Sequence, residues 1–209
     1  MKKKFKIQKD KLLAQKRVYV ILLILLAIGI FLGLLYPLFL SNENTSLLST
    51  SITSFFNNVL NNQINYNVGI KNSLLTNSIF LLSIWLFGIS LIGLPIVLVL
   101  LIYKGFIFGF SVSSIIKVYG IKGIFGAFTY IFPGTILALI PTILLCFYST
   151  SFSIKLFKYL FLIVNLNFQA IINKYLNILG ISFVSFMLVS ISDVYLAPVF
   201  MKVFTFLIK

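Results

Sequence analysis

The sequence contains no histidine, a single cysteine and only three acidic residues in 209 positions. The acids are Asp10, Glu43 and Asp193, and the cysteine is Cys146. A metal cluster built from histidine, cysteine and carboxylate ligands cannot be assembled from this set. A disulfide framework is excluded too, so Cys146, in an apolar stretch, is expected to act as a small hydrophobic side chain. We therefore expect neither a metal nor another cofactor.

Apolar residues dominate the rest of the sequence. The chain is 60% hydrophobic and only 10% charged, with a mean hydropathy of +1.12. A water-soluble domain of this size cannot bury so much apolar surface, so most of the chain is predicted to lie in a lipid bilayer. The expected fold class is an all-α polytopic membrane protein with about five transmembrane helices, six being possible, and short amphipathic segments.

Positive charge is concentrated at the start of the chain. Eight of the seventeen basic residues lie in the tail 1–17, directly before the first apolar run. This placement is typical of a cytoplasmic anchor beside an anionic leaflet. It does not favour nucleic-acid binding, because no aromatic platform or folded basic face accompanies the tail. We expect a multi-pass cell-membrane protein with a cytoplasmic N-terminus and no nucleic-acid partner.

The apolar runs predict where the chain crosses the membrane, since one transmembrane helix needs about 20 apolar residues. Residues 18–40 are uncharged and long enough for the first crossing. Residues 74–148 are predicted to form a central bundle of three transmembrane helices. Residues 175–209 hold the last transmembrane helix and the C-terminus, which lies outside the cytoplasm with five crossings and inside with six.

Gly93 and Pro95 are predicted to break the central apolar run. Glycine tolerates a turn, whereas proline lacks an amide donor and disfavours helix in the residue before it. Two helices, 74–93 and 95–116, are therefore expected, in tight antiparallel contact. Pro133 is expected to kink the fourth helix.

Two polar segments are predicted to lie outside the bundle. Residues 41–73 carry little positive charge and are placed on the extracytoplasmic side. Their apolar residues recur at helical spacing, which predicts an amphipathic helix on the membrane, against a partner or against the chain's own bundle. Residues 149–174 are basic and predict an amphipathic helix on the inner leaflet, with a sixth crossing as the alternative. The candidate docking residues in the first segment are Ile52, Phe55, Phe56 and Val59.

Small residues mark the expected helix contacts. Gly105 and Gly109 are four residues apart, a spacing that lets two membrane helices approach closely. We expect them to pack against helix 74–93, with a homodimer interface as the alternative. Gly88 is a further candidate for close packing or a turn.

Lys104 and Asp193 are the candidate charges inside the membrane. Burying an ionisable residue at the centre of a transmembrane helix costs about 2.5–3.5 kcal/mol, so such a residue suggests a function. Asp193 is predicted to pair with Lys104 or Lys117 and lock the last helix onto the central pair, or to dock a partner. The alternative is an interfacial carboxylate near the outer surface.

Few arrangements for catalysis remain. Asp10 and Glu43 are predicted on opposite sides of the membrane, so they cannot form a carboxylate pair. Glu43 with Asp193 is not excluded, but nothing in the sequence indicates a substrate cleft between them. Lys104 could serve as a base for Ser111, although serines are common in membrane helices as partners of the backbone. We expect that the protein is not an enzyme.

Two stretches carry a resemblance to a known family. Residues 85–96 (WLFGISLIGLPI) and 103–110 (YKGFIFGF) closely resemble the central signature of the stage II sporulation protein M family. Residues 130–133 (YIFP) and 192–198 (SDVYLAP) resemble the family's fourth-helix proline and its acid-x-Tyr-x-x-Pro ending. Many relatives in the broader family carry a Pro-His-Gly…Glu pattern, but Gly134 directly follows Pro133 here, and the His and Glu are absent.

The resemblance implies a membrane scaffold for engulfment during endospore formation. In that family the protein localises two cell-wall hydrolases, stage II sporulation proteins D and P, at the septal membrane while they remodel peptidoglycan. The alternative function is a permease subunit of an ABC-type export system, for which residues 149–174 would provide the cytoplasmic coupling helix.

Overall fold

The protein is almost entirely helical. The structure is a computed structural model that describes residues 2–161 and 167–208, and no strand occurs in these two ranges. Side chains are described for residues 16–129, 131, 134–161 and 167–202. The predicted all-α class is confirmed.

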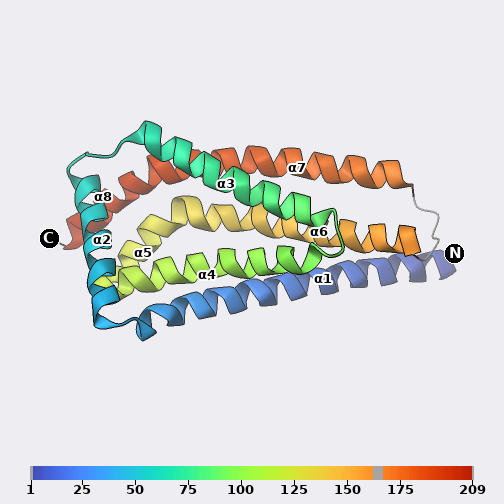
Figure 1. The fold of residues 1–209 in the computed structure, drawn as a ribbon, viewed down its shortest axis with the longest axis horizontal. Coiled ribbons are helices and arrows are strands. Elements are labelled where there is room, and N and C mark those ends of the chain that lie inside the picture. Colours follow the sequence, from blue (N-terminus) through green and yellow to red (C-terminus); the bar gives the residue numbers. More distant parts are fainter. Residues whose placement is uncertain (1, 162–166, 209) are drawn as a thin grey trace.

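Five helical segments are long and apolar enough to cross a membrane, as the sequence predicts. No sixth candidate crossing occurs among the described residues, and the start of α1 and the C-terminal α8 lie at opposite ends of the bundle (Figure 1). An odd number of crossings requires this arrangement. The five segments are Lys16–Phe39, Tyr66–Gly88, Leu94–Tyr119, Gly134–Phe161 and Phe168–Lys202.

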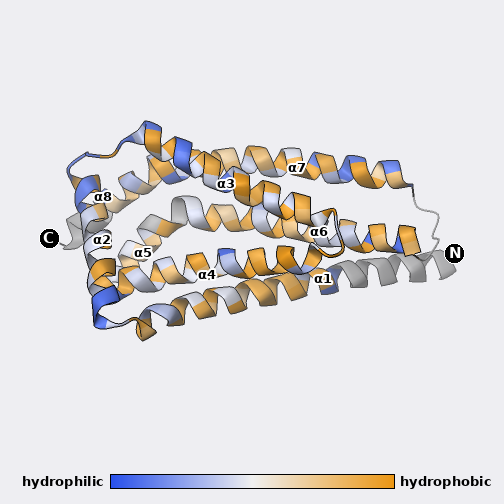
Figure 2. Cartoon of the chain, viewed as in Figure 1, coloured by the Kyte–Doolittle hydropathy of each residue, from blue (hydrophilic) through white to orange (hydrophobic). Residues whose placement is uncertain are grey.

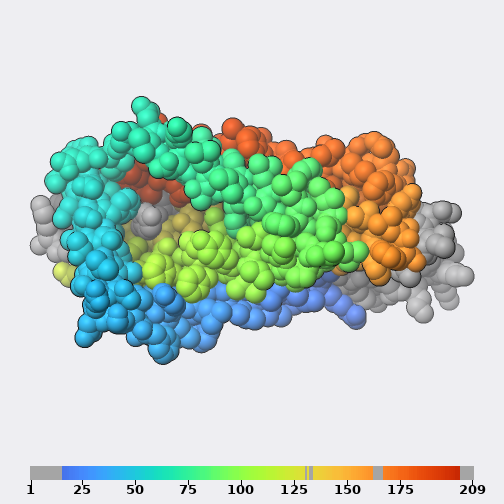
Figure 3. Space-filling model, viewed as in Figure 1, coloured from blue at the N-terminus to red at the C-terminus, as the bar shows by residue number. Residues whose placement is uncertain are grey.

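The long helices lie side by side, and α2 crosses one end of them next to α5 and α8 (Figure 1). Hydrophilic residues gather on α2 and on the adjoining part of α3, whereas α4 is mostly hydrophobic (Figure 2). The surface is hollowed between α2, α3 and α4 (Figure 3). The elements are α1 (Lys2–Leu35), η1 (Tyr36–Phe39), α2 (Asn42–Leu60), α3 (Tyr66–Gly88), α4 (Leu94–Tyr119), α5 (Lys122–Ile131), η2 (Phe132–Ile136), α6 (Leu137–Phe161), α7 (Phe168–Ile191), η3 (Ser192–Leu196) and α8 (Ala197–Ile208).

Polar caps and a glycine set several helix ends. The side chains of Asn65 and Asn167 accept hydrogen bonds from the amides of Val68 and Ala170, both at 3.2 Å, and so cap α3 and α7. These caps start both crossings earlier than the hydrophobic runs alone predict. α4 ends at Tyr119 and is followed by Gly120, whose φ of +60° favours a residue without a Cβ.

The predicted break between the second and third crossings is present. α3 ends at Gly88, and Pro95 lies in the first turn of α4, where its missing amide donor is not needed. Gly93 sits in the turn between them, and a Cβ there would overlap the carbonyl of Phe87. Pro133 lies in η2, a π-helical turn, but its side chain is outside the described set.

All five crossings contribute to one apolar core. Cys146 is fully buried in this core, in agreement with its predicted role as a small hydrophobic side chain. The buried members are Leu22 and Leu26 of α1, Leu81 and Ile84 of α3, Val97 and Leu101 of α4, Ala138, Leu145 and Cys146 of α6, and Phe186 and Val189 of α7.

The closest helix contact joins α1 and α4 through glycines on both sides. A Cβ on Gly105 or Gly109 would overlap the carbonyl oxygen of Leu26 or Ile30 in α1. The two helices run parallel, because residues further along α4 meet residues further along α1. Without side chains the backbones approach closely enough for Cα–H···O contacts. The reciprocal glycines on α1 are Gly29 and Gly33, which face the carbonyls of Ile102 and Phe106.

This contact corrects the predicted partner of Gly105 and Gly109. Internal packing is confirmed, but the partner is the first crossing and not the second. The reason is that α1 carries its own pair of glycines at the same spacing, whereas those of α3, Gly69 and Gly88, are far apart. The glycine face is occupied within the chain, so a homodimer would need a different surface.

Residues 149–174 do not form the predicted amphipathic surface helix. α6 continues through this segment to Phe161, α7 begins at Phe168, and the intervening residues 162–166 lie outside the described part. The physical reason is that Ser149, Phe152 and Ser153 are buried. The start of the segment therefore packs in the bundle, whereas Tyr159 and Leu160 near the end of α6 are exposed.

We predict that Gly109→Ala destabilises the protein, because the added methyl group would push α1 away from α4. Overpacking of this kind costs about 1–3 kcal/mol, or about 2–4 °C in melting temperature per kcal/mol. The measurement is the apparent melting temperature of the detergent-solubilised protein. Gly180→Ala on α7 is the matched control, since a Cβ there meets nothing within 4 Å. Equal melting temperatures for the two variants would contradict the glycine contact.

Candidate functional site

Asp193 lies where two irregular helical turns meet. It belongs to η3, a π-helical turn within the last crossing, and is half-buried. Its carboxylate occupies the space beside Gly134 of η2, where a Cβ would overlap it. π-Helical turns interrupt the regular backbone ladder and are frequent at functional sites. Because Gly134 has no side chain, it leaves the room that the carboxylate occupies.

Lys104 supplies the opposite charge. Lys104 of α4 and Asp193 of η3 carry opposite charges and both lie in membrane-crossing segments. No direct ion pair joins Asp193 to a lysine among the described side chains. The ammonium of Lys104 lies 5.0 Å from the centre of the Phe80 ring, which is within the range of a cation–π contact. The predicted pairing of Lys104 with Asp193 stays a prediction.

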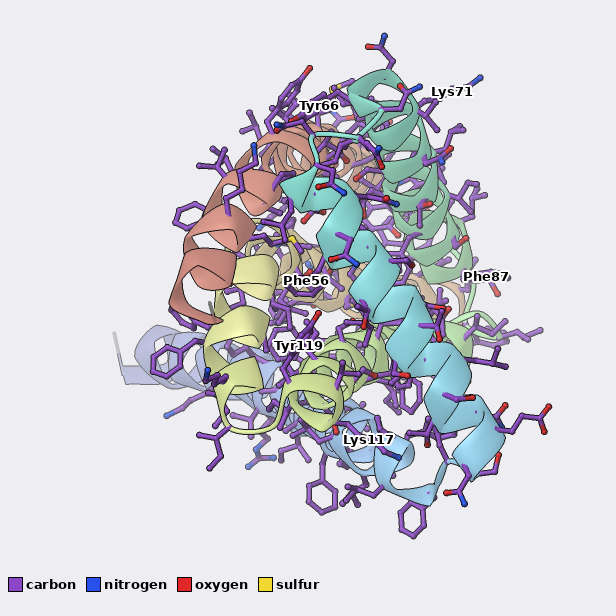
Figure 4. The ribbon with its side chains drawn as sticks, turned by 90° about the vertical axis from the view of Figure 1, so that its left-hand side faces the viewer. Phe56, Tyr66, Lys71, Phe87, Lys117 and Tyr119 are labelled. Carbon is purple, nitrogen blue, oxygen red and sulfur yellow. The ribbon has the colours of Figure 1, made fainter. Side chains whose placement is uncertain are left out.

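Lys117 forms hydrogen bonds to other groups and not to Asp193, so the alternative pairing of Lys117 with Asp193 is wrong. Its ammonium donates hydrogen bonds to the carbonyl of Pro37 and, at 3.0 Å, to the hydroxyl of Thr45. Lys117 lies between the end of α4 and the start of α2 (Figure 4). It therefore fastens α4 to the connection between the first crossing and α2.

A buried polar seam holds the end of α3 against α6 and α7. Tyr175 donates to the carbonyl of Trp85 at 2.8 Å, and Ser149 bonds the Tyr175 hydroxyl at 2.9 Å. Ser153 donates to the carbonyl of Gly88 at 2.7 Å. These carbonyls belong to the last turn of a helix, where intrahelical partners are missing.

Gly88 is needed for the seam, as its predicted packing role requires. A Cβ on Gly88 would overlap Ser149 and the hydroxyl of Tyr175. Sequence reasoning missed the residues that face it. The available signal was the pair of small polar residues four apart, Ser149 and Ser153, which had been assigned to a surface helix.

The predicted docking residues on α2 mostly face the protein's own bundle. Phe56 and Val59 are 3% and 0% exposed, and they pack with Ile115 and Met201 among others. Phe56 and Tyr119 lie between α2 and α5, with ring centres 5.2 Å apart (Figure 4). Packing of this helix against its own bundle, one of the expected alternatives, is confirmed.

The other two candidates on α2 differ in exposure. Ile52 is half-buried and Phe55 is 43% exposed. Phe55 alone of the four predicted residues thus presents a large exposed fraction to a partner.

The structure does not bring Lys104 and Ser111 together. The hydroxyl of Ser111 donates to the carbonyl of Ile107 at 2.9 Å, within its own helix. The Lys104 ammonium instead faces Phe80. This arrangement does not supply an activated nucleophile.

Comparison with protein families gives one match. The family model described as stage II sporulation protein M matches residues 22–198. The chain belongs to this family. The matched range covers the apolar part of α1 and all four later crossings up to the start of α8, including Lys104, Gly134 and Asp193. Membership of the stage II sporulation protein M family makes this a sporulation-related membrane protein. No curated protein and no solved structure matches the chain.

We predict that Asp193→Asn and Lys104→Gln each lower the apparent melting temperature, because each leaves one charge inside the bundle without its counter-charge. In the double variant the loss should be smaller than the sum of the two. Coupled neighbours typically show interaction energies of about 0.5–3 kcal/mol. Strictly additive losses would show that the two charges do not act on each other.

Proposed function

We propose that this protein is a membrane scaffold for endospore engulfment that localises peptidoglycan-remodelling hydrolases at the septal and engulfing membrane. The observation that carries the proposal is the family match over residues 22–198. The hydrolases would be stage II sporulation proteins D and P, which the family resemblance implies as partners. With three acids and no histidine in the chain, wall hydrolysis is assigned to these partners.

The charge distribution supports an orientation for the scaffold. Residues 2–17 form the start of α1, and the end of α6 and the start of α7 lie at the same end of the bundle (Figure 1). Lys155 and Lys158 belong to the last turns of α6, and Lys174 to the first turns of α7. The positive-inside rule assigns this end to the cytoplasm. The opposite end, with α2 and Glu43, then faces the outside, where wall hydrolases act.

α2 is suited to be the outer contact surface. Phe56, Val59 and the bonds of Lys117 hold it across the end of the bundle, so its outward face is fixed. α2 exposes Leu47 by 61% and Phe55 by 43% of their surface, and both residues lie beside a groove that α2 forms with η1 and α4. A helix held in one position loses little conformational freedom when a partner binds, which favours affinity.

The test is a pull-down of the detergent-solubilised full chain from sporulating cells. We expect wall hydrolases to co-purify with the unaltered protein and to be reduced severalfold by Phe55→Ser. Phe157→Ser is the matched control, because Phe157 is 39% exposed at the opposite end of the bundle. Single variants are preferred to deletion of residues 41–73, since α2 is part of the packed structure.

Two results would contradict the scaffold. One is the absence of wall hydrolases from every preparation. The other is the recovery of an ATPase that is indifferent to both variants, which would favour the permease. Nothing in the fold favours the permease at present, since residues 149–174, the candidate coupling helix, are divided between α6 and α7.

A further inference from the structure

A groove of about 590 Å³ lies between α2, η1 and the last turns of α4. Its walls are mostly apolar and include no charged side chain among the residues that line it. A groove of this size and lining is typical of a site for a small molecule or one lipid chain. Among the lining residues are Tyr36 and Leu40 beside η1, Leu48 and Ile52 of α2, and Phe110 and Ser114 of α4.

Ser114 is an unusual member of this lining. It is only 3% exposed, and its hydroxyl has no hydrogen-bond partner among the described residues. Its neighbour Ser111, which also lines the groove, donates to a carbonyl of its own helix. A buried hydroxyl left without a partner costs free energy. Ser114 therefore offers a donor to an acceptor that enters the groove.

Lys117 lies one helical turn beyond Ser114 on the same side of α4, about 4.5 Å further along the axis. Its ammonium bonds to Pro37 and Thr45, residues adjacent to the lining, so the charge sits at the rim of the groove. The first turn of α2 adds partial positive charge there. Glu43 in that turn carries the opposing charge but is exposed and does not line the groove.

We propose that this groove binds one anionic glycerophospholipid. The phosphate lies at Lys117, an ester carbonyl accepts the hydrogen bond of Ser114, and one acyl chain runs along Phe110 and the apolar face of α2. The order of charge, hydroxyl and apolar surface along one side of α4 matches the order of phosphate, ester and chain in such a lipid. The lipid site does not rest on the proposed scaffold function, although Leu47 and Phe55 border both surfaces.

The test is native mass spectrometry of the full chain in detergent, titrated with phosphatidylglycerol or with phosphatidylcholine. We expect one tightly bound phosphatidylglycerol and at least a fivefold preference over phosphatidylcholine. Lys117→Gln should abolish the preference, and Lys117→Arg should retain it. Ser114→Val should weaken the binding of both lipids. Ser111→Phe fills the groove and should remove tight binding of both lipids. Lys71→Gln is the control, since this exposed lysine lies on α3, away from Lys117 (Figure 4).

Three outcomes would overturn the site. The first is unchanged lipid binding in Ser111→Phe. This variant does not alter Lys117, so it still tests the site if Lys117→Gln does not fold. The second is an equal loss of the preference for phosphatidylglycerol in Lys71→Gln and Lys117→Gln. That result would indicate only a general attraction of anionic lipid to positive charge on the protein. The third is a dimer of the chain that Ser111→Phe dissociates, which would show that a second copy fills the groove.

Discussion

The rest of the structure depends on the close approach of α1 and α4. In a bilayer the lipid is as apolar as the helix surface, so helices associate through packing and polar contacts more than through the hydrophobic effect. Two pairs of glycines let the backbones of α1 and α4 approach so closely that carbonyl oxygens take the places of the missing Cβ atoms. This contact fixes the end of the first crossing beside the end of α4. Lys117 can then reach Pro37 and Thr45 and hold α2 across the bundle.

The remaining crossings are joined to this pair by polar groups. α3 is tied to α6 and α7 by the seam around Tyr175, and Asn77 of α3 bonds Ser190 of α7 at 2.9 Å. Asp193 and Gly134 bring the two π-helical turns together. Buried hydrogen bonds of this kind contribute modestly each, but they select one arrangement of helices that are otherwise uniformly apolar.

The sequence predicts those features that depend on local pattern. The lengths of the hydrophobic runs predict five crossings, and the helical spacing of apolar residues predicts the amphipathic α2. Gly93 and Pro95 predict the break between the second and third crossings. Each of these signals lies within one continuous stretch of sequence. Helix partners depend on contacts that are distant in sequence, so the assignment of Gly105 and Gly109 to α3 was wrong. The spacing of Gly29 and Gly33 was available as a signal. Residues 149–174 were misassigned because a helix that packs on a bundle and one that lies on a membrane share the same periodicity.

We propose that the five crossings place α2 outside the cytoplasm and the end of α6 inside. The most direct measurement is labelling of single cysteines in protoplasts with a membrane-impermeant maleimide, in a Cys146→Ala background. We predict that Ser54→Cys in α2 is labelled in intact protoplasts and that Lys158→Cys in α6 is labelled only after permeabilisation. The reverse pattern, or labelling of both positions from the same side, would contradict the account.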